Sequence, residues 1–215
     1  MCLELCTLHL QINGSEDTIL ANSLFADGAG AVLVSARPPQ PGNTAYRVCD
    51  FDSALIPSGL DAMAWSIGDL GFDISLSSYV PKIIGAGIFD VLQPLLTRND
   101  LSIADVQRWA VHPGGKSIVD KVATSLELSA EQVSTSRNVL RNFGNMSCAT
   151  ILFVLKEMLE QANAEDREKV CAIAFGPGLT VETALLQIDR IADGSPCCFC
   201  DNRWQRTSES CWFSA

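Results

Sequence analysis

The sequence predicts an α/β protein in which helices cover a mixed sheet. Two kinds of segment indicate this fold class: short apolar or alternating stretches typical of strands, and longer stretches whose apolar residues recur every three or four positions, as on one face of a helix. They alternate along the chain, which favours layers of helix and sheet. With 215 residues, 47% hydrophobic and 19% charged, the chain can bury a core and does not have the composition of a disordered protein.

The first part of the chain is predicted to form strands and one short helix. Residues 2–12 alternate, with one change of phase, which predicts a largely buried strand. That strand begins at the first residue without a preceding turn, which indicates a sequence that starts inside a fold. Ser15, Glu16 and Asp17 predict the start of a helix that ends before Asp27. Three more segments are predicted as strands: 31–34, 44–51 and 74–76.

From Val80 onward the period becomes that of helices. Apolar residues at steps of three and four predict a helix from Val80 to about Thr97, with Pro81 in its first turn. A helical turn and three more helices are expected at 100–102, 116–126, 130–140 and 145–159. Strands are expected at 109–112, 170–174 and 179–188, the last two joined in a hairpin by a Gly-Pro-Gly hinge.

Charge and cysteine content limit which binding partners and which cellular compartment are expected. The chain has 15 Lys and Arg residues against 25 Asp and Glu residues, a net charge of −10 without a basic cluster, which excludes DNA and RNA as main partners. No window of about 18 uninterrupted apolar residues indicates a membrane span, and Glu4 lies where a signal peptide would be basic. Most of the nine cysteines, such as Cys49, Cys148 and Cys171, resemble small buried hydrophobes. We therefore expect a soluble, cytoplasmic protein.

Two polar residues at element ends are the candidates for chemistry. Of the two histidines, His9 lies within a predicted strand and is expected to be structural. His112 ends a strand before Pro-Gly-Gly, where the backbone can approach a ligand. Asn145 follows Gly144 at the start of an apolar helix, so it could be a helix N-cap. Alternatively, a His N–H and an Asn NH₂ that converge on one oxygen would form an oxyanion hole, suited to a thioester carbonyl and to the enolate of a decarboxylated malonyl group.

Three motifs resemble those of a known family. WAVHPGG at 109–115, GNMSCA at 144–149 and FGPGLT at 175–180 have the order and approximate spacing found in type III polyketide synthases, the chalcone and stilbene synthase family of the thiolase superfamily. LFADGA at 24–29 and Val80-Pro81 extend the resemblance over residues 2–188. The resemblance implies a thiolase-like fold, of which residues 1–190 are one C-terminal half of a two-half layered structure. Residues 191–215 are expected to be a disordered, Cys-containing tail.

The family uses a Cys-His-Asn triad, in which a Cys thiolate takes the acyl group from CoA and the other two residues steady the malonyl-derived enolate. By resemblance, His112 and Asn145 are the second and third members. The resemblance implies an acyltransferase of polyketide biosynthesis that uses acyl-CoA and malonyl-CoA as substrates and no cofactor. The expected assembly is a homodimer or an association with a full-length synthase.

Further positions carry over from the family residue by residue. Phe25 matches a phenylalanine at the junction of the CoA tunnel and the acyl cavity. Ile74 lies where the family has a second aromatic gatekeeper, a departure that would leave a roomier pocket. The remaining positions match a loop of the cavity wall and a CoA-contacting loop: Gly176, Pro177 and Gly178, and Lys116 and Ser117.

The main departure from the family concerns the nucleophile. In the family the nucleophilic Cys lies upstream of the strand that corresponds to residues 2–12, so this chain alone is expected to be inactive. Cys148, three residues after Asn145, is a weak alternative nucleophile. Cys2 and Cys6 are expected to be inert, because burial on a core strand raises a thiol pKa. The tail cysteines do not have the spacing of a zinc site, and no metal is expected.

Three alternatives remain open at this point. A noncatalytic fragment or truncated paralogue could associate with a full-length synthase through an exposed apolar face. A fatty-acid-initiating ketoacyl synthase also pairs His with Asn, although Pro113 and the GPGLT string favour the polyketide branch. A Ser hydrolase would use Ser66 in the elbow-like segment 64–68, but no apolar strand leads into Ser66 and Ala64 replaces the first elbow glycine.

Overall fold

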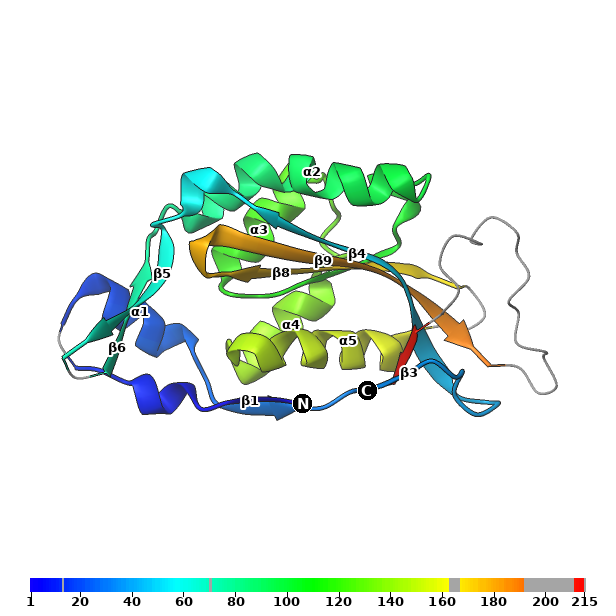
Figure 1. Ribbon diagram of the computed structural model, residues 1–215, viewed down its shortest axis with the longest axis horizontal. Helices are drawn as coiled ribbons and strands as arrows, with labels where there is room; N and C mark the ends of the chain where they lie inside the picture. Colours follow the sequence, from blue (N-terminus) through cyan, green and yellow to red (C-terminus); the bar gives the residue numbers. More distant parts are fainter. Residues whose placement is uncertain (13, 70, 163–166, 192–210, 215) are drawn as a thin grey trace.

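The computed structural model describes residues 1–12, 14–69, 71–162, 167–191 and 211–214. These residues form a six-stranded mixed sheet with helices on both faces, which confirms the predicted fold class (Figure 1). In order across the sheet, the strands are β3 (Leu33–Ser35), β10 (Cys211–Ser214), β4 (Thr44–Leu55), β9 (Thr180–Arg190), β8 (Lys169–Gly176) and β7 (Arg108–Val111). Only the β7–β8 pair is parallel.

Two long strands form the centre of the sheet. β4 pairs with β9 from Thr44 opposite Arg190 to Leu55 opposite Thr180, with one irregularity in register after Val48. β8 and β9 form the expected hairpin, closed by a short turn in which Gly178 has a φ of +74°. This is the left-handed region, which a glycine reaches without the steric cost of a Cβ.

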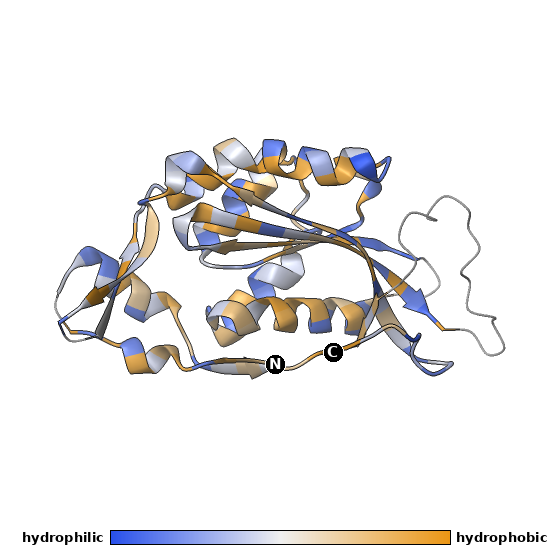
Figure 2. Ribbon diagram, in the orientation of Figure 1, coloured by the Kyte–Doolittle hydropathy of each residue, from blue (hydrophilic) through white to orange (hydrophobic). Residues whose placement is uncertain are grey.

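Helices cover both faces of the sheet. α2 (Val80–Arg98) and α3 (Lys116–Ser125) lie on one face, and α4 (Ser134–Phe143) and α5 (Thr150–Gln161) on the other (Figure 1). The first face buries Trp109 from β7, and the second buries Tyr46 from β4. Figure 2 shows hydrophilic residues on the side of α2 that faces away from the sheet, as an amphipathic core helix requires.

By length and composition alone, α2 is apolar enough to cross a membrane. Six of its apolar residues are instead buried in the fold: Val80, Ile84, Ile88, Leu92, Leu95 and Leu96. It carries Lys82, Asp90 and Arg98 as well, and Arg98 forms salt bridges to Asp50 and Asp52 of β4 at 2.6 and 2.8 Å. In this structure α2 is therefore a core helix of the sheet layer.

The N-terminal segment differs from the expected buried strand. Only β1 (Cys2–Glu4) is a strand, paired with β2 (Gly28–Gly30), and Cys6–His9 forms a 3-10 turn where the sequence changes phase. Leu8 is 77% exposed and Ile12 is 96% exposed, so the prediction of one buried strand over residues 2–12 is wrong outside Cys2–Glu4. The strand expected at 31–34 is β3, whose Leu33 and Val34 are also exposed. Apolar side chains at regular spacing are buried only where another layer of the structure packs against them.

A second hairpin was not predicted. β5 (Met63–Gly68) pairs antiparallel with β6 (Gly71–Leu76), and the expected strand at 74–76 is only the end of β6. Ser66 lies in the middle of β5, opposite Asp73. A nucleophile elbow needs a sharp turn between a strand and a helix, so the Ser hydrolase alternative is wrong.

Several helix starts shift from their predicted positions. α1 (Glu16–Leu24) begins as expected, with Ser15 accepting a hydrogen bond from the Thr18 N–H at 3.2 Å. α4 begins at Ser134 rather than residue 130, and α5 begins at Thr150 after a 3-10 turn over Ser147–Ala149. The helical turn expected at 100–102 occurs at Ile103–Asp105, capped by Ser102.

The end of the chain joins the sheet. Cys211–Ser214 forms β10, which pairs with both β3 and β4, and Phe213 stacks on Tyr46 with ring centroids 4.8 Å apart. The expectation of a disordered tail is therefore wrong for these four residues. Cys197, Cys198 and Cys200 lie outside the described residues, and the domain limits at 190 and 191 stay a prediction.

Candidate active site

A cavity of about 340 Å³ lies where the β5–β6 hairpin and α1 meet the ends of β7 and β8. Six residues predicted for the site line it: Phe25, Ile74, His112, Ser117, Asn145 and Pro177. Lys116, Gly176 and Gly178 are not lining residues, although each is adjacent in sequence to one that is. Most other lining residues are apolar, so the cavity combines a few polar groups with an apolar wall, as small-molecule sites do.

His112 directly follows the C-terminal end of β7. Its backbone N–H donates to the Ile173 carbonyl of β8 at 2.7 Å, which continues the parallel pairing for one residue. Pro113 and Gly114 then turn the chain toward α3, and the Gly114 N–H donates back to the His112 carbonyl at 2.9 Å. The strand end therefore places the imidazole in the cavity.

Burial controls the protonation of His112. The residue is only 9% exposed, and desolvation lowers the pKa of its imidazole from 6.5 to about 4. At neutral pH the ring is uncharged, so one nitrogen carries an N–H donor and the other is an acceptor. A neutral donor of this kind can polarise a carbonyl without adding a buried charge.

Asn145 is held by its neighbours on both sides. Its side-chain oxygen accepts the Ser147 N–H at 3.0 Å, and its Nδ2 donates to the Gly114 carbonyl at 3.2 Å. The second N–H of the carboxamide has no acceptor among the residues that the structure describes. Because α5 begins at Thr150 with Ala149 as its N-cap, Asn145 is not the cap of that helix.

The backbone around Asn145 is joined to the N-terminal part of the chain. The Asn145 N–H donates to Leu24 O and its carbonyl accepts from the Ala26 N–H, both at 2.9 Å, a bridge that also positions Phe25. Gly144 has a φ of +74°, and a Cβ there would lie 3.1 Å from the Ala26 Cβ. The tight turn needs a glycine, which explains the Gly-Asn sequence in physical terms.

The geometry brings the two donors to one cavity. The Asn145 side chain binds the carbonyl of Gly114, two residues after His112, and both side chains line the same space. Phe25 and Ile74 line it from the α1 end and from β6. Ser117 and Lys116 are in the first turn of α3 rather than in a loop, and both are exposed.

Sequence reasoning missed the wall contributed by α1 and the β5–β6 hairpin. Met63 and Trp65 of β5 lie opposite Leu76 and Ile74 of β6, and all four residues line the cavity. The Trp65 ring also contacts the His9 ring edge-on, with centroids 5.2 Å apart. His9 lies in an exposed 3-10 turn and not in the predicted strand. The alternating apolar residues on either side of Gly68 and Gly71 were the hairpin signal available in the sequence.

The cysteines do not supply a nucleophile here. Among the described residues, no cysteine lines the cavity. The Cys148 residue is exposed, not buried as the sequence suggests. Its thiol is nevertheless partly desolvated, and this desolvation, followed by the effects of Glu4 and Cys2, raises the thiol pKa to about 12. Such a thiol stays protonated at neutral pH, so the alternative of Cys148 as nucleophile is disfavoured. Cys2 and Cys6 are half-buried, not on a core strand, and burial raises the pKa of Cys6.

The lowered pKa of His112 predicts a pH dependence of stability. Between pH 4 and 6.5 the unfolded chain binds a proton at this residue that the folded chain does not. The stability that the fold keeps by holding this imidazole neutral is fully present above pH 6.5. It is lost as the pH falls toward 4, and the free energy of unfolding decreases by up to about 3 kcal/mol. Urea unfolding at pH 7.5 and 4.5 should show a smaller loss of stability for His112→Gln than for the unmodified chain. Equal losses would contradict a neutral, buried imidazole.

Comparisons with known proteins show which family the chain is similar to. The model of the family "Chalcone and stilbene synthases, C-terminal domain" matches residues 50–189. The chain is 35% identical over 195 residues to "Alpha-pyrone synthesis polyketide synthase-like Pks18" of Mycobacterium tuberculosis, covering 88% of this chain and 49% of that protein. It is 34% identical over 192 residues to a 3,5-dihydroxyphenylacetyl-CoA synthase of Streptomyces toyocaensis, covering 87% and 49%.

Two solved structures have the same fold. PKS-I from the brown alga Ectocarpus siliculosus superposes with a TM-score of 0.76 at 28% identity, covering 86% of this chain and 51% of that one. The C-terminal type III polyketide synthase domain of Steely1 from Dictyostelium gives a TM-score of 0.75 at 27% identity, covering 88% and 53%. The chain thus spans about half the length of the curated relatives it matches. It belongs to the chalcone and stilbene synthase family, and its fold is that of the C-terminal half of type III polyketide synthases.

Proposed function

We propose that this chain is the thioester-polarising half of an acyltransferase of polyketide biosynthesis, which condenses an acyl-CoA starter with malonyl-CoA by decarboxylation. The observation that carries the proposal is the pairing of two uncharged donors, His112 and Asn145, in one largely apolar cavity. Membership of the family and the CoA product named for the Streptomyces toyocaensis relative support it.

The donors suit the charge that develops in decarboxylation. When the malonyl C–C bond breaks and CO₂ leaves, the electron pair moves onto the thioester carbonyl and forms an enolate, which a proton then converts to acetyl-CoA. The imidazole N–H and the second carboxamide N–H would donate to that oxygen. Fixed donors in a site shielded from water stabilise such a charge more than water does.

The apolar wall suits an uncharged acyl group. Leu20, Leu24, Met63 and Ile74 line the cavity, and none of the described lining residues is an Asp, Glu, Lys or Arg. A volume of about 340 Å³ is at the lower end of the range for small-molecule sites. We propose that the acyl chain lies against this wall with its thioester at the donor pair.

Condensation also needs a nucleophile that accepts the acyl group, and the described part of the chain places no cysteine in the cavity. We propose that a Cys-bearing half joins this one, either in the same assembly or from a full-length synthase. The chain alone is then expected to decarboxylate malonyl-CoA slowly but to form no extended product.

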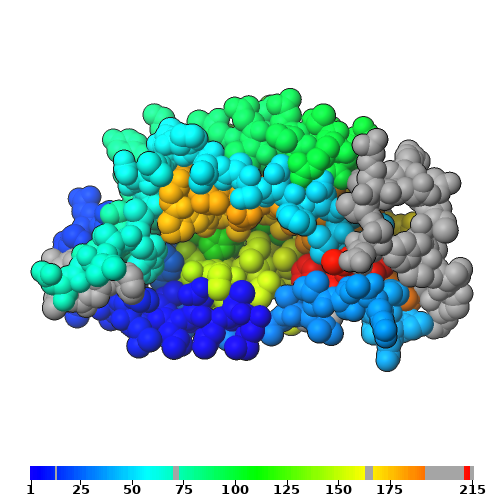
Figure 3. Space-filling model, in the orientation of Figure 1, coloured from blue at the N-terminus to red at the C-terminus, as the bar shows by residue number. Residues whose placement is uncertain are grey.

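A second candidate function is noncatalytic association with a full-length synthase, with or without self-association. The observation that favours it is a set of exposed apolar side chains on the N-terminal segment, which lies at the lower left of the face shown in Figure 3: Met1, Leu3, Leu8, Leu10 and Ile12. Apolar patches of this kind mark interaction surfaces.

One assay separates the two candidates. The chain is incubated with malonyl-CoA labelled at the free carboxyl carbon, and the release of labelled CO₂ is compared with a buffer blank. Release above the blank, without an extended product, supports the acyltransferase half. Release equal to the blank at saturating malonyl-CoA, together with retention on an immobilised full-length synthase, supports the noncatalytic alternative.

A further inference from the structure

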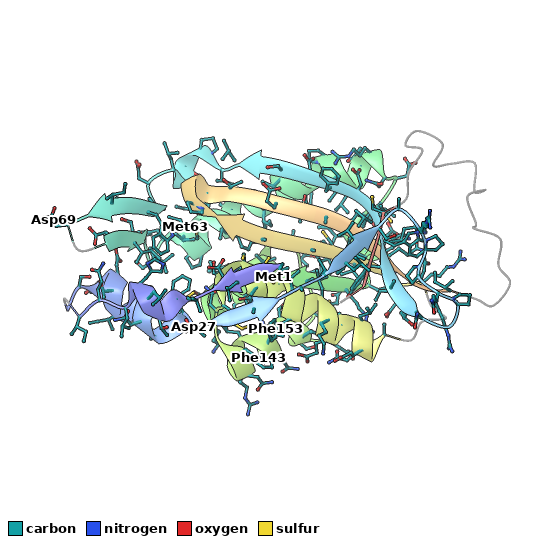
Figure 4. All side chains as sticks on the ribbon, turned by 60° about the horizontal axis from the view of Figure 1, so that its bottom comes forward. Met1, Asp27, Met63, Asp69, Phe143 and Phe153 are labelled. Atoms are coloured by element: carbon teal, nitrogen blue, oxygen red, sulfur yellow. The ribbon has the colours of Figure 1, made fainter. Side chains whose placement is uncertain are left out.

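Two cysteines that are distant in sequence meet beside the candidate site. β1 lies against the Ser147–Ala149 turn, and the Cys148 N–H donates to the Glu4 Oε1 at 3.4 Å. Cys2 and Glu4 are two residues apart on β1, so their side chains lie on the same face of the strand, and, after partial burial, both contribute to raising the pKa of the Cys148 thiol. Figure 4 views the face of the molecule on which β1 lies, with Met1 labelled at its start. The fold therefore holds two thiols next to each other.

Both residues of the pair are at least partly exposed. Cys148 is exposed and Cys2 is half-buried, and neither lines the cavity. Cys171, in contrast, is completely buried in β8. An oxidant therefore has access to this pair without entering the core.

We propose that Cys2 and Cys148 form a disulfide when the protein meets a low-molecular-weight disulfide such as oxidised glutathione. The thiolate of one cysteine attacks a sulfur of the oxidant, which breaks its S–S bond, forms a mixed disulfide and releases one thiol. The thiolate of the second cysteine then attacks the cysteine sulfur of that mixed disulfide and releases the second thiol. The two cysteines lose two protons and two electrons, and the oxidant is reduced to two thiols.

The bond would restrain the loop that carries Asn145. The Ser147 N–H, one residue before Cys148, donates to the Asn145 side-chain oxygen at 3.0 Å. A covalent link from Cys148 to β1 therefore limits the motion of the turn that orients the carboxamide. The reaction requires neither CoA binding nor decarboxylation, so its failure would leave the proposed function standing, and the reverse also holds.

The groups around Cys148 predict how the rate of its oxidation depends on pH and on the charge of Glu4. Partial burial, then the effects of Glu4 and Cys2, keep this thiol protonated at neutral pH. Exchange proceeds through thiolates, so oxidation should be slow at pH 7 and faster at pH 9. Glu4→Gln removes a negative charge beside the thiol and should speed oxidation several-fold, an effect that proximity of the two cysteines alone would not produce.

The test uses the full chain with oxidised glutathione or with dithiothreitol. Remaining thiols are alkylated, the protein is digested without reduction, and linked peptides are identified by mass spectrometry. The main product should join Cys2 to Cys148, and it should be absent from Cys2→Ser and Cys148→Ser. Cys6→Ser is the matched control, because Cys6 lies on the same N-terminal segment and is also half-buried. That variant should keep the link.

Two further results would overturn the proposal. One is a dominant link between Cys148 and any cysteine other than Cys2, and the other is accumulation of glutathione adducts without a link inside the chain. Because the unmodified chain gives this answer by itself, a variant that fails to fold does not affect it. Hydrogen exchange at residues 146–150 should also slow roughly tenfold in the oxidised chain, and unchanged exchange would contradict the restraint on the loop.

Discussion

Release of CO₂ from malonyl-CoA by this chain is expected to fall about 10²–10³-fold when Asn145 is replaced with alanine. The variant removes one of the two donors proposed to bind the enolate oxygen, and the alanine methyl leaves the His112 imidazole in place. It also frees the Gly114 carbonyl that Asn145 binds at 3.2 Å. Labelled CO₂ is counted over time at saturating malonyl-CoA, so that the rate rather than the affinity is compared.

Asn142→Ala is the matched control for this prediction. Asn142 is exposed, three residues earlier in the chain, and the substitution makes the same chemical change. Its rate should equal that of the unmodified chain. A rate for Asn145→Ala within a factor of two or so of the control would remove Asn145 from the donor pair. Circular dichroism is compared for both variants, because Asn145 is buried and a loss of rate counts only where the secondary structure is kept.

Replacing Trp109 with alanine is expected to lower the free energy of unfolding by about 3–5 kcal/mol. Trp109 is completely buried between the sheet and the α2–α3 layer. The substitution removes a large packed side chain and leaves a cavity that the surrounding strands and helices fill only in part. Urea unfolding followed by circular dichroism measures the loss without using tryptophan fluorescence.

Two comparisons make the Trp109 result specific. The indole Nε1 has no hydrogen-bond partner within the described part of the chain, so Trp109→Phe should cost much less than Trp109→Ala. Trp65→Ala makes the same change at a side chain that is 43% exposed, and it should also cost clearly less. Equal costs for the two tryptophans would show that burial does not control the effect.

Much of the central architecture could be predicted from local patterns. The apolar period over 80–97 and the Ser15 cap correspond to α2 and α1, and the Gly-Pro-Gly hinge corresponds to the β8–β9 hairpin. The strand predicted at 44–51 is β4, which continues to Leu55. These elements follow from helix period, caps and turn residues, which act over a few neighbouring positions.

The candidate site could be predicted only in part. The His112 strand end and the Gly144-Asn145 turn have recognisable sequences, so the sequence predicts both residues. The cavity wall from Met63 and Trp65 is not predictable in this way, because it depends on the pairing of β5 with β6 across a hairpin of which only residues 74–76 are predicted as strand. The bridge between Phe25 and Asn145 joins segments far apart in sequence, and no local pattern specifies such a contact.

Local sequence patterns specify the α/β class, the periods of the main elements and the turn residues at His112 and Asn145. Which faces are covered depends on tertiary packing: residues 2–12 alternate yet remain largely exposed, and Cys148 is exposed in a turn that lies against β1. The two differ in the separation along the chain over which each interaction acts. Backbone sterics and caps act over a few residues, whereas burial and the meeting of side chains depend on which distant segment packs against them.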